Sequence, residues 1–251
     1  MIKDLRFDIP VASLFFYVFG YAIHKTRYIS KHRDKYSTQD MFDFGCDIMN
    51  TVRRHAWTTT DAYGQENIPQ DETAVFYSNH QGKYDALGIL TSMNGKPCSV
   101  LWEKKRADRI LAREMAFLSQ AVLIDLETMK GKAKGIVDAI GLIKEGNNML
   151  VFPEGKTEPT KGNKLGEFQT GCFAISMKTK TTIVPTVIWD SFKAMNGNKI
   201  FKHVTTQVHF LEPIPYSEYE NLNKQELSNL VEARISEKLK ELEIQYGQVL
   251  K

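Results

Sequence analysis

The chain has 251 residues, of which 42% are hydrophobic and 25% are charged, and its formal net charge is +3. This composition excludes disorder as the overall state, because the chain holds enough apolar side chains to build a sizeable core. The small positive charge does not by itself indicate a nucleic-acid-binding protein. The three cysteines, Cys46, Cys98 and Cys172, are odd in number and far apart, which fits a reducing compartment.

An almost uncharged apolar run, IPVASLFFYVFGYAI, occupies residues 9–23. Its length of about fifteen residues is short of the roughly twenty that span the hydrocarbon of a bilayer. Acidic residues balance the basic residues before the run, and a basic stretch follows it. A cleaved signal peptide is therefore not expected, because it needs a basic start and a small-residue cleavage site after the run.

A second helix is predicted over residues 39–52. The residues at helical spacing there are Met41, Phe44, Gly45, Ile48, Met49 and Val52. A basic linker joins the two apolar segments, with Lys25, Arg27, Lys31, Arg33 and Lys35. Such a helix pair favours a monotopic membrane anchor, with apolar side chains in the acyl region and cations on anionic headgroups. The alternative is a hydrophobic helix that packs on the core beside a solvated loop.

From residue 60 onward, short apolar strands alternate with helical patterns. Strands are predicted over residues 74–78, 99–102, 121–125, 148–152, 181–188 and 205–211. Helices are predicted over residues 85–93, 107–117, 132–144, 171–178 and 224–246. The alternation predicts an α/β fold with a mostly parallel central sheet flanked by helices. We expect two parts: a two-helix membrane anchor over residues 1–58 and an α/β domain over residues 59–251.

Two of these helices have a clear apolar face. The helix over 132–144 is expected to bury Ile136, Val137, Ile140 and Ile143, and to end before Gly146 at its C-cap. The final helix has an apolar stripe of Leu227, Leu230, Val231, Ile235, Leu239 and Leu242. This stripe predicts a helix that docks on the core.

The stretch FYSNHQGKYDALG, residues 76–88, places a histidine and an aspartate where a strand gives way to a helix. The end of a strand in an open α/β sheet is where ligands and catalytic groups gather. A turn between His80 and Asp85 can fold the two side chains together, whereas one continuous helix would point them about 140° apart. The carboxylate can then hold one imidazole N–H and leave the other nitrogen as a base. The alternative is a structural turn histidine held by an aspartate.

A second strand ends in the same way, in MLVFPEGKTEP at residues 149–159. Gly155 lets the backbone approach a ligand closely, and Lys156 supplies charge for a phosphate. A basic loop with Lys161 and Lys164 follows. The alternative is a polar turn between a strand and a helix.

Together these residues resemble the glycerolipid acyltransferase family, whose best-known members acylate lysophosphatidic acid. NHQGKYD matches its His-x-x-x-x-Asp motif, and FPEG at residues 152–155 matches its phosphate-site motif. LGEFQTGCFAIS at residues 165–176 and IVPTVI at residues 183–188 resemble the segments that follow. The matches keep their order over about residues 60–215. Family members also carry a short N-terminal helix pair at the membrane interface.

The resemblance implies a mechanism and a set of site residues. His80 would take a proton from a lysophospholipid hydroxyl, which attacks an acyl thioester of coenzyme A or acyl carrier protein, while Asp85 orients His80. Backbone N–H groups near the turn are expected to hold the oxyanion. The residues expected to bind substrate and its phosphate are Lys104, Lys105, Glu154, Gly155, Lys156 and Thr157.

This chain departs from the family at its phosphate motifs. The family usually has threonine and then often arginine after Glu-Gly, where this chain has Lys156 and Thr157. A second motif begins with lysines, matched by Lys104 and Lys105, but ends in Asp125-Leu126 where Asp-Arg is usual. Arginine grips phosphate bidentately and lysine acts as a point charge, so the acceptor is less well defined than the acyl transfer.

The favoured function is acylation of 1-acyl-sn-glycerol 3-phosphate to phosphatidic acid, at the cytoplasmic face of the cell membrane by a peripheral protein. Other acceptors are another lysophospholipid or glycerol 3-phosphate. Other functions are a thioester hydrolase, disfavoured by a dry site, and a non-catalytic lipid-binding module. No cofactor, metal ion or nucleic acid is expected. The six histidines show no pair at metal-ligand spacing.

Overall fold

The computed structural model describes residues 9, 13–14, 16–107, 111–157, 161–194 and 202–247. Part of the apolar run at 9–23 and of the helix predicted over 107–117 therefore lies outside the described residues. So do residues 158–160, between the Pro-Glu-Gly turn and the basic loop.

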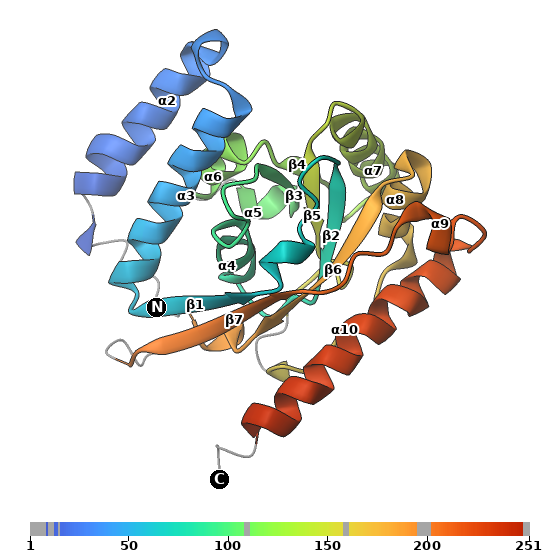
Figure 1. Ribbon diagram of the computed structural model, residues 1–251. Coiled ribbons are helices and arrows are strands. Elements are labelled where there is room, and N and C mark those ends of the chain that lie inside the picture. The colour runs from blue at the N-terminus through green and yellow to red at the C-terminus, as the bar shows by residue number, and fades with distance from the viewer. Residues whose placement is uncertain are drawn as a thin grey trace.

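One central sheet organises the described part of the chain (Figure 1). Its seven strands are β1 (Thr58–Tyr63), β2 (Ala74–Ser78), β3 (Cys98–Glu103), β4 (Val122–Ile124), β5 (Asn148–Val151), β6 (Thr182–Trp189) and β7 (Val204–Phe210). The strand order is β1-β7-β6-β2-β5-β3-β4. Neighbours run parallel except β6 and β7, which are antiparallel. The predicted mostly parallel α/β sheet is confirmed.

Helices cover both faces of this sheet. On one side lie α2 (Ile23–Lys31), α3 (Thr38–His55), α4 (Asp85–Leu90), α5 (Lys104–Ala107) and α6 (Ala112–Leu118); on the other lie α7 (Met129–Lys144), α8 (Ala174–Thr179) and α10 (Lys224–Tyr246) (Figure 1). Shorter elements are the π-helix η1 (Phe16–Ala22), the 3₁₀ turns η2 (Arg33–Lys35), η3 (Gln65–Asn67), η5 (Thr170–Phe173) and η6 (Ser191–Lys193), and α9 (Tyr216–Tyr219).

The two faces of β2 show how the core is divided. Val75 and Tyr77 belong to a buried cluster shared with α7, α8 and α10, whereas Ala74 and Phe76 belong to one shared with α3 and α4. All five residues of β2 are buried, as expected for a central parallel strand covered on both faces. This arrangement holds the carboxyl end of β2, and the turn that follows it, against rigid elements.

The N-terminal helices pack on the domain. A capping box of Ser37 and Asp40 starts α3, because the Ser37 side chain accepts from the Asp40 N–H while the Asp40 carboxylate accepts from the Ser37 N–H. The apolar residues of α3 and α2 enter a buried cluster with residues from α6 and β7. Packing therefore accounts for the apolar side of α3. Phe16, Phe19 and Tyr28 remain exposed at the surface.

Several element predictions need correction. The strand β1 was not predicted from the sequence. The described residues around the helix predicted over 107–117 form two short helices, α5 and α6, with residues 108–110 outside the description. On α7, Ile143 is buried and Ile136 and Ile140 are partly buried against the core, as predicted, but Val137 is 64% exposed. The helix also buries Gly135 and Ala139. In the described part of the chain, no helix is both long enough and apolar enough to cross a bilayer.

Candidate active site

Loops that carry polar side chains meet at one edge of the sheet. β2, β5 and β6 are parallel neighbours, so their carboxyl ends lie at the same edge. His80 follows β2, Glu154 follows β5 and Ser191 follows β6. Three segments that are far apart in the sequence therefore supply side chains to one place, at the edge where open α/β sheets bind ligands.

The predicted contact between His80 and Asp85 is present. His80 Nδ1 lies 2.7 Å from Asp85 Oδ2, so the imidazole N–H donates to the carboxylate. α4 begins at Asp85, and the intervening turn folds the aspartate back toward the histidine. The Asp85 side chain is fully buried, while the His80 side chain is 21% exposed. Nε2 is thereby left as the imidazole nitrogen that can meet a substrate.

Asp85 accepts more hydrogen bonds than the one from His80. The backbone N–H groups of Gln81 and Gly82 donate to Oδ2, and the hydroxyl of Ser191 donates to Oδ1 at 2.6 Å. Hydrogen bonds to the charged form of a buried carboxylate favour that form. The turn is thus built around the Asp85 carboxylate. The N–H groups of Gln81 and Gly82 are committed to it, so they do not supply the oxyanion donors expected from the sequence.

Phe152 packs against the imidazole of the dyad, the pair formed by His80 and Asp85. Its ring stacks on the His80 imidazole, with 4.1 Å between centroids and 20° between planes. The aromatic ring limits the rotation of the imidazole and removes water from one of its faces. The orientation of His80 therefore depends on Asp85 at one edge and on Phe152 at one face.

The Pro-Glu-Gly turn holds the histidine turn. Glu154 is buried, and its Oε1 accepts a hydrogen bond from the backbone N–H of His80 at 2.9 Å. Its Oε2 forms an ion pair with Lys161, which is also largely buried. Gly155 adopts a φ of +70° and donates its N–H to Phe152 O at 3.0 Å. In this arrangement Glu154 joins two loops, and the left-handed turn at Gly155 suits a residue without Cβ.

The lysines expected to bind phosphate lie in two groups. Lys156 is exposed directly beyond the Gly155 turn, with the partly exposed Thr157 after it. Lys104 and Lys105 begin α5 at the end of β3, the strand beside β5. Lys105 forms an ion pair with Glu127. Among the three predicted lysines, Lys156 is therefore the closest along the chain to the Pro-Glu-Gly turn.

A polar network behind the dyad was missed in the sequence. Gln81 Nε2 donates to Asn163 Oδ1 and to Ile188 O, at 2.9 and 3.0 Å. Asn163 in turn donates to Asp190, and Ser191 contacts Gln81 and Asp85. The signal was the segment DSF, residues 190–192, directly after the strand ending IVPTVIW. Polar residues at the end of a strand parallel to β2 meet the same criterion that identified Glu154.

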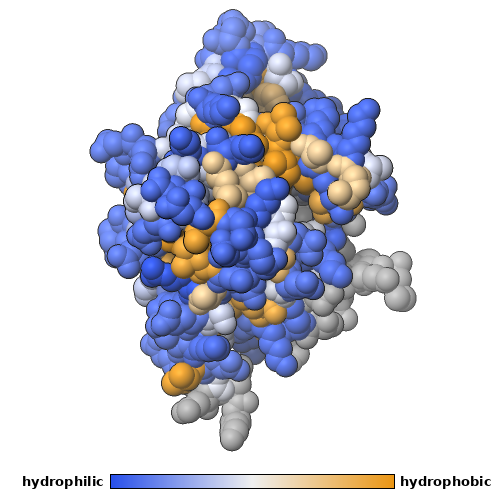
Figure 2. Space-filling view, turned by 90° about the vertical axis from the view of Figure 1, so that its right-hand side faces the viewer, coloured by the Kyte–Doolittle hydropathy of each residue, from blue (hydrophilic) through white to orange (hydrophobic). Residues whose placement is uncertain are grey.

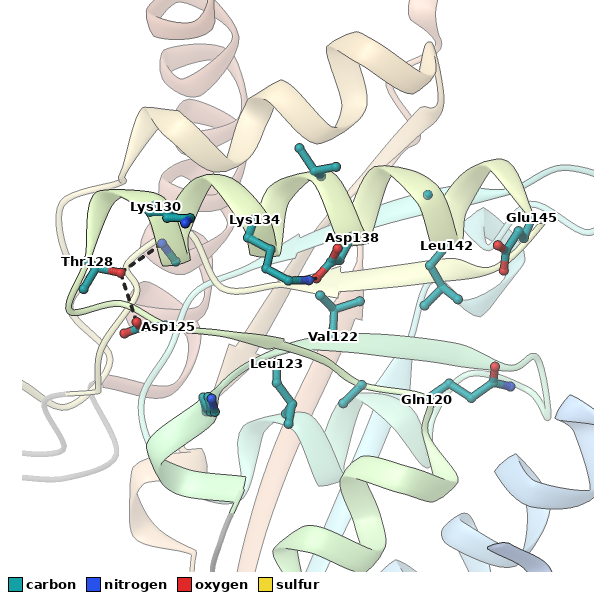
Figure 3. Close-up of a pocket in the computed structure, with 15 residues that line it drawn as sticks. Gln120, Val122, Leu123, Asp125, Thr128, Lys130, Lys134, Asp138, Leu142 and Glu145 are labelled. Carbon is teal, nitrogen blue, oxygen red and sulfur yellow. Dashed lines mark hydrogen bonds and ion pairs between the residues drawn. The ribbon is translucent and has the colours of Figure 1, made fainter. Parts of the chain in front are cut away.

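A groove lies between the edge strand β4 and helix α7, with a volume of about 980 Å³ (Figure 3). Val122, Leu142 and the Lys134–Asp138 ion pair point into it, and Thr128 bonds Asp125 at one end (Figure 3). Figure 2, in which the right-hand side of Figure 1 faces the viewer, shows hydrophobic residues in patches on a mostly hydrophilic surface. His80 and Asp85 do not line the groove. Chemistry and geometry place the candidate active site at the dyad.

No group of three or more histidine, cysteine or acidic side chains in the described residues is arranged to hold a metal ion. The expectation that the protein works without a metal stays a prediction. The dyad itself contains a base and an orienting carboxylate, which suits proton abstraction from a hydroxyl.

Known proteins resemble this chain in sequence and in fold. The 1-acyl-sn-glycerol-3-phosphate acyltransferase of Borreliella burgdorferi is 24% identical over 185 residues, 72% of each chain. That of Salmonella typhimurium is 27% identical and covers 68% of each. The chloroplastic enzyme LPAT1 of Arabidopsis thaliana is 28% identical over 68% of this chain, which spans about half of the plant protein's length (48%).

The crystal structure of the 1-acyl-sn-glycerophosphate (LPA) acyltransferase PlsC from Thermotoga maritima superposes with a TM-score of 0.71. The superposition covers 96% of this chain and 94% of the Thermotoga maritima chain, with 21% sequence identity, and shows that the two proteins share a fold. Residues 60–189, just over half of the chain, match the family model Acyltransferase. This match contains the dyad, the Pro-Glu-Gly turn and the strand β6, and the chain belongs to the acyltransferase family.

Proposed function

We propose that the protein transfers a fatty acyl group from an acyl thioester to the free hydroxyl of 1-acyl-sn-glycerol 3-phosphate, which gives phosphatidic acid. The observation that carries this proposal is the 2.7 Å contact between His80 Nδ1 and the buried Asp85 carboxylate. The names of the bacterial and plant relatives support the choice of acceptor.

The reaction begins with proton transfer to His80. Nε2 accepts the proton of the acceptor hydroxyl as its oxygen attacks the thioester carbonyl, and the imidazolium that forms is stabilised by Asp85. The tetrahedral intermediate then collapses, the carbon–sulfur bond breaks, and the thiol leaves with the proton from His80. No covalent acyl-enzyme is required, because the attacking hydroxyl belongs to the substrate.

The phosphate of the acceptor is assigned to the cations at the ends of β5 and β3. Lys156 is the primary candidate because it is exposed just after the turn that holds His80. Lys104 and Lys105 lie one strand farther along the sheet. Glu154 and Gly155 shape the turn, and Thr157 follows it. Lysine binds phosphate as a point charge, so this site tolerates more variation in acceptor geometry than an arginine fork does.

The acyl donor in this proposal is a thioester of coenzyme A or of acyl carrier protein. The membrane surface is the source of the lysophospholipid, and the protein binds its cytoplasmic face peripherally through the N-terminal segment. Support for this comes from Phe16, which is 87% exposed, and from the exposed Phe19 and Tyr28. Aromatic side chains with nearby lysines and arginines are typical of interfacial helices.

A matrix of acyl donors against acceptors, measured with the purified full-length protein in detergent, tests this function. The donors are acyl-CoA and acyl carrier protein thioesters; the acceptors are lysophosphatidic acid, other lysophospholipids, glycerol 3-phosphate and water. His80→Ala serves as the blank. Phosphatidic acid formation that disappears in the blank supports the proposal. Turnover retained by His80→Ala contradicts the role of His80 as the base, and release of free fatty acid alone contradicts acyl transfer to a lipid.

A further inference from the structure

The buried carboxylate of Asp85 has two oxygens with different partners. Oδ2 receives the imidazole of His80 and two backbone N–H groups, while Oδ1 receives the hydroxyl of Ser191 at 2.6 Å. Both Asp85 and Ser191 are fully buried. Ser191 thus holds the oxygen that His80 does not use, from a segment 106 residues farther along the chain.

The position of Ser191 is fixed by its own neighbours. The preceding residue, Asp190, adopts a left-handed conformation with a φ of 61°, which turns the chain as it leaves β6. Asn163 fixes that conformation, because it accepts from the Asp190 N–H at 2.9 Å and donates to the Asp190 carboxylate at 2.9 Å. A left-handed residue that is not glycine persists where its surroundings determine it. The hydroxyl of Ser191 therefore reaches Asp85 from a rigid support.

The single hydroxyl proton of Ser191 has two acceptors within reach. Asp85 Oδ1 is 2.6 Å away and Gln81 Oε1 is 2.9 Å away. The hydroxyl donates to Asp85 Oδ1, the nearer of the two acceptors, because hydrogen bonds to a carboxylate are shorter and stronger than those to an amide oxygen. Gln81 is held elsewhere, since its Nε2 donates to Asn163 and to Ile188 O.

We propose that Ser191 is a positioning residue that orients the Asp85 carboxylate and, through it, the His80 base. This inference rests on the proposed catalytic role of the dyad. Ser191 contacts Asp85 and Gln81 and has no contact with the His80 ring that would make it a nucleophile. Without its hydroxyl, Oδ1 is left buried without a donor, and the carboxylate can rotate away from the imidazole.

A double-mutant cycle tests this role. Ser191→Ala is expected to lower kcat by roughly tenfold or more, with little change in the KM of either substrate, as expected for one lost charge-assisted hydrogen bond. Asp85→Asn is expected to lower kcat by about a hundredfold. In the Asp85→Asn background, Ser191→Ala should cause almost no further loss, because the oriented carboxylate is already gone.

A serine of matched burial provides the control. Ser119 is also buried and donates to Met115 O at 2.8 Å in α6. Ser119→Ala removes a hydroxyl of the same size, and kcat should stay within about twofold of the parent. Thermal unfolding of every variant is measured alongside turnover. If Ser191→Ala does not fold, Ser191→Cys keeps the size and weakens the donor, and the same cycle is run with it.

The outcomes separate the two proposals. A positioning role is supported if Ser191→Ala lowers turnover in the parent protein but not in the Asp85→Asn background. An equal loss in both backgrounds, or no loss in either, overturns it while leaving the dyad intact. Full activity of Asp85→Asn overturns the role of the dyad on which this inference rests.

Discussion

The backbone N–H of His80 donates to Glu154 Oε1 at 2.9 Å, so the histidine turn and the Pro-Glu-Gly turn are joined through a buried carboxylate. The same carboxylate forms an ion pair with Lys161 in the loop that follows. Glu154 therefore connects three segments at the carboxyl edge of the sheet. The family resemblance associates Glu154 with substrate binding, but in this structure its carboxylate holds the backbone of His80.

Glu154→Gln should destabilise the protein and lower turnover. The amide still accepts from the His80 N–H, but Lys161 is left as a largely buried cation without its partner. Breaking a buried pair from one side costs about 3 kcal/mol, which urea unfolding measures directly. The double variant Glu154→Gln with Lys161→Met removes both charges and should recover most of that loss. No recovery in the double variant would mean that the ion pair does not determine the stability of this turn.

Phe152→Leu should lower kcat by about threefold to tenfold, because the imidazole loses its stacked ring. Phe152→Tyr keeps the ring and is the matched control, with kcat close to that of the parent. Steady-state rates at saturating donor and acceptor separate this effect from binding. Equal rates for the leucine and tyrosine variants would remove stacking from the mechanism.

The sequence predicts the central elements of the fold well, since their burial leaves a clear pattern. The bounds of β2 and of α10 agree with the prediction to the residue. β1 was missed because its sequence, TTTDAY, is mostly polar and alternates between buried and exposed positions at a sheet edge. An edge strand covered on one face does not carry the continuous apolar run of a central strand.

The exposed Val137 has a different cause. Helix α7 approaches β4 through small residues, and a Cβ at Gly135 would lie 2.7 Å from Ile124 Cγ1. The contact face is therefore set by glycine and alanine, which a search for large apolar residues passes over. Hydrophobic periodicity alone assigned the wrong face to part of this helix.

The candidate site was predictable only in part. His80 and Glu154 follow strong apolar strands, and Asp85 begins the helix after the first of them, so their positions were found from the sequence. Asn163 and Ser191 join the site through hydrogen bonds across 82 and 106 residues of sequence. Such long-range pairs depend on the strand order, which the sequence pattern does not specify.

Lys156→Ala should raise the KM for the acceptor more than the KM for the donor. The lysine is exposed beside the dyad-holding turn, and loss of one phosphate contact weakens ground-state binding of the phosphorylated substrate. Lys144→Ala is the control, because Lys144 is an exposed lysine in the last turn of α7. An unchanged acceptor KM in Lys156→Ala would remove Lys156 from the phosphate site.

Protein stability should fall as the pH drops from about 6.5 to 4, in part because of His209. Burial, and secondarily the nearby Lys238, lowers the pKa of His209 to about 4 in the folded protein. The unfolded chain has the ordinary pKa near 6.5, so in this window it binds a proton that the folded state does not. The free energy of unfolding therefore rises with pH across the window, by about 2 kcal/mol from this residue.

The variant His209→Gln tests this assignment, with the exposed His203→Gln as the control. Urea unfolding at several pH values should show a shallower decline toward acid for His209→Gln than for the parent. The parent and His203→Gln should decline in parallel. Parallel curves for all three proteins would mean that His209 does not contribute to the acid sensitivity.

Exposed aromatic residues of the N-terminal segment should determine binding to lipid. Deletion of residues 1–55 is a poor test, because α2 and α3 share a buried apolar cluster with the domain and their loss would uncover it. Phe16→Ser with Phe19→Ser keeps this cluster and replaces two aromatic rings that are 87% and 40% exposed. We expect this double variant to bind vesicles of anionic phospholipid at least tenfold more weakly, because each ring that enters the lipid contributes apolar area to the interface.

The exposed Ile244 at the end of α10 gives the control variant Ile244→Ser, which should sediment with vesicles like the parent. Equal sedimentation of all three proteins would place the lipid-binding surface elsewhere on the molecule.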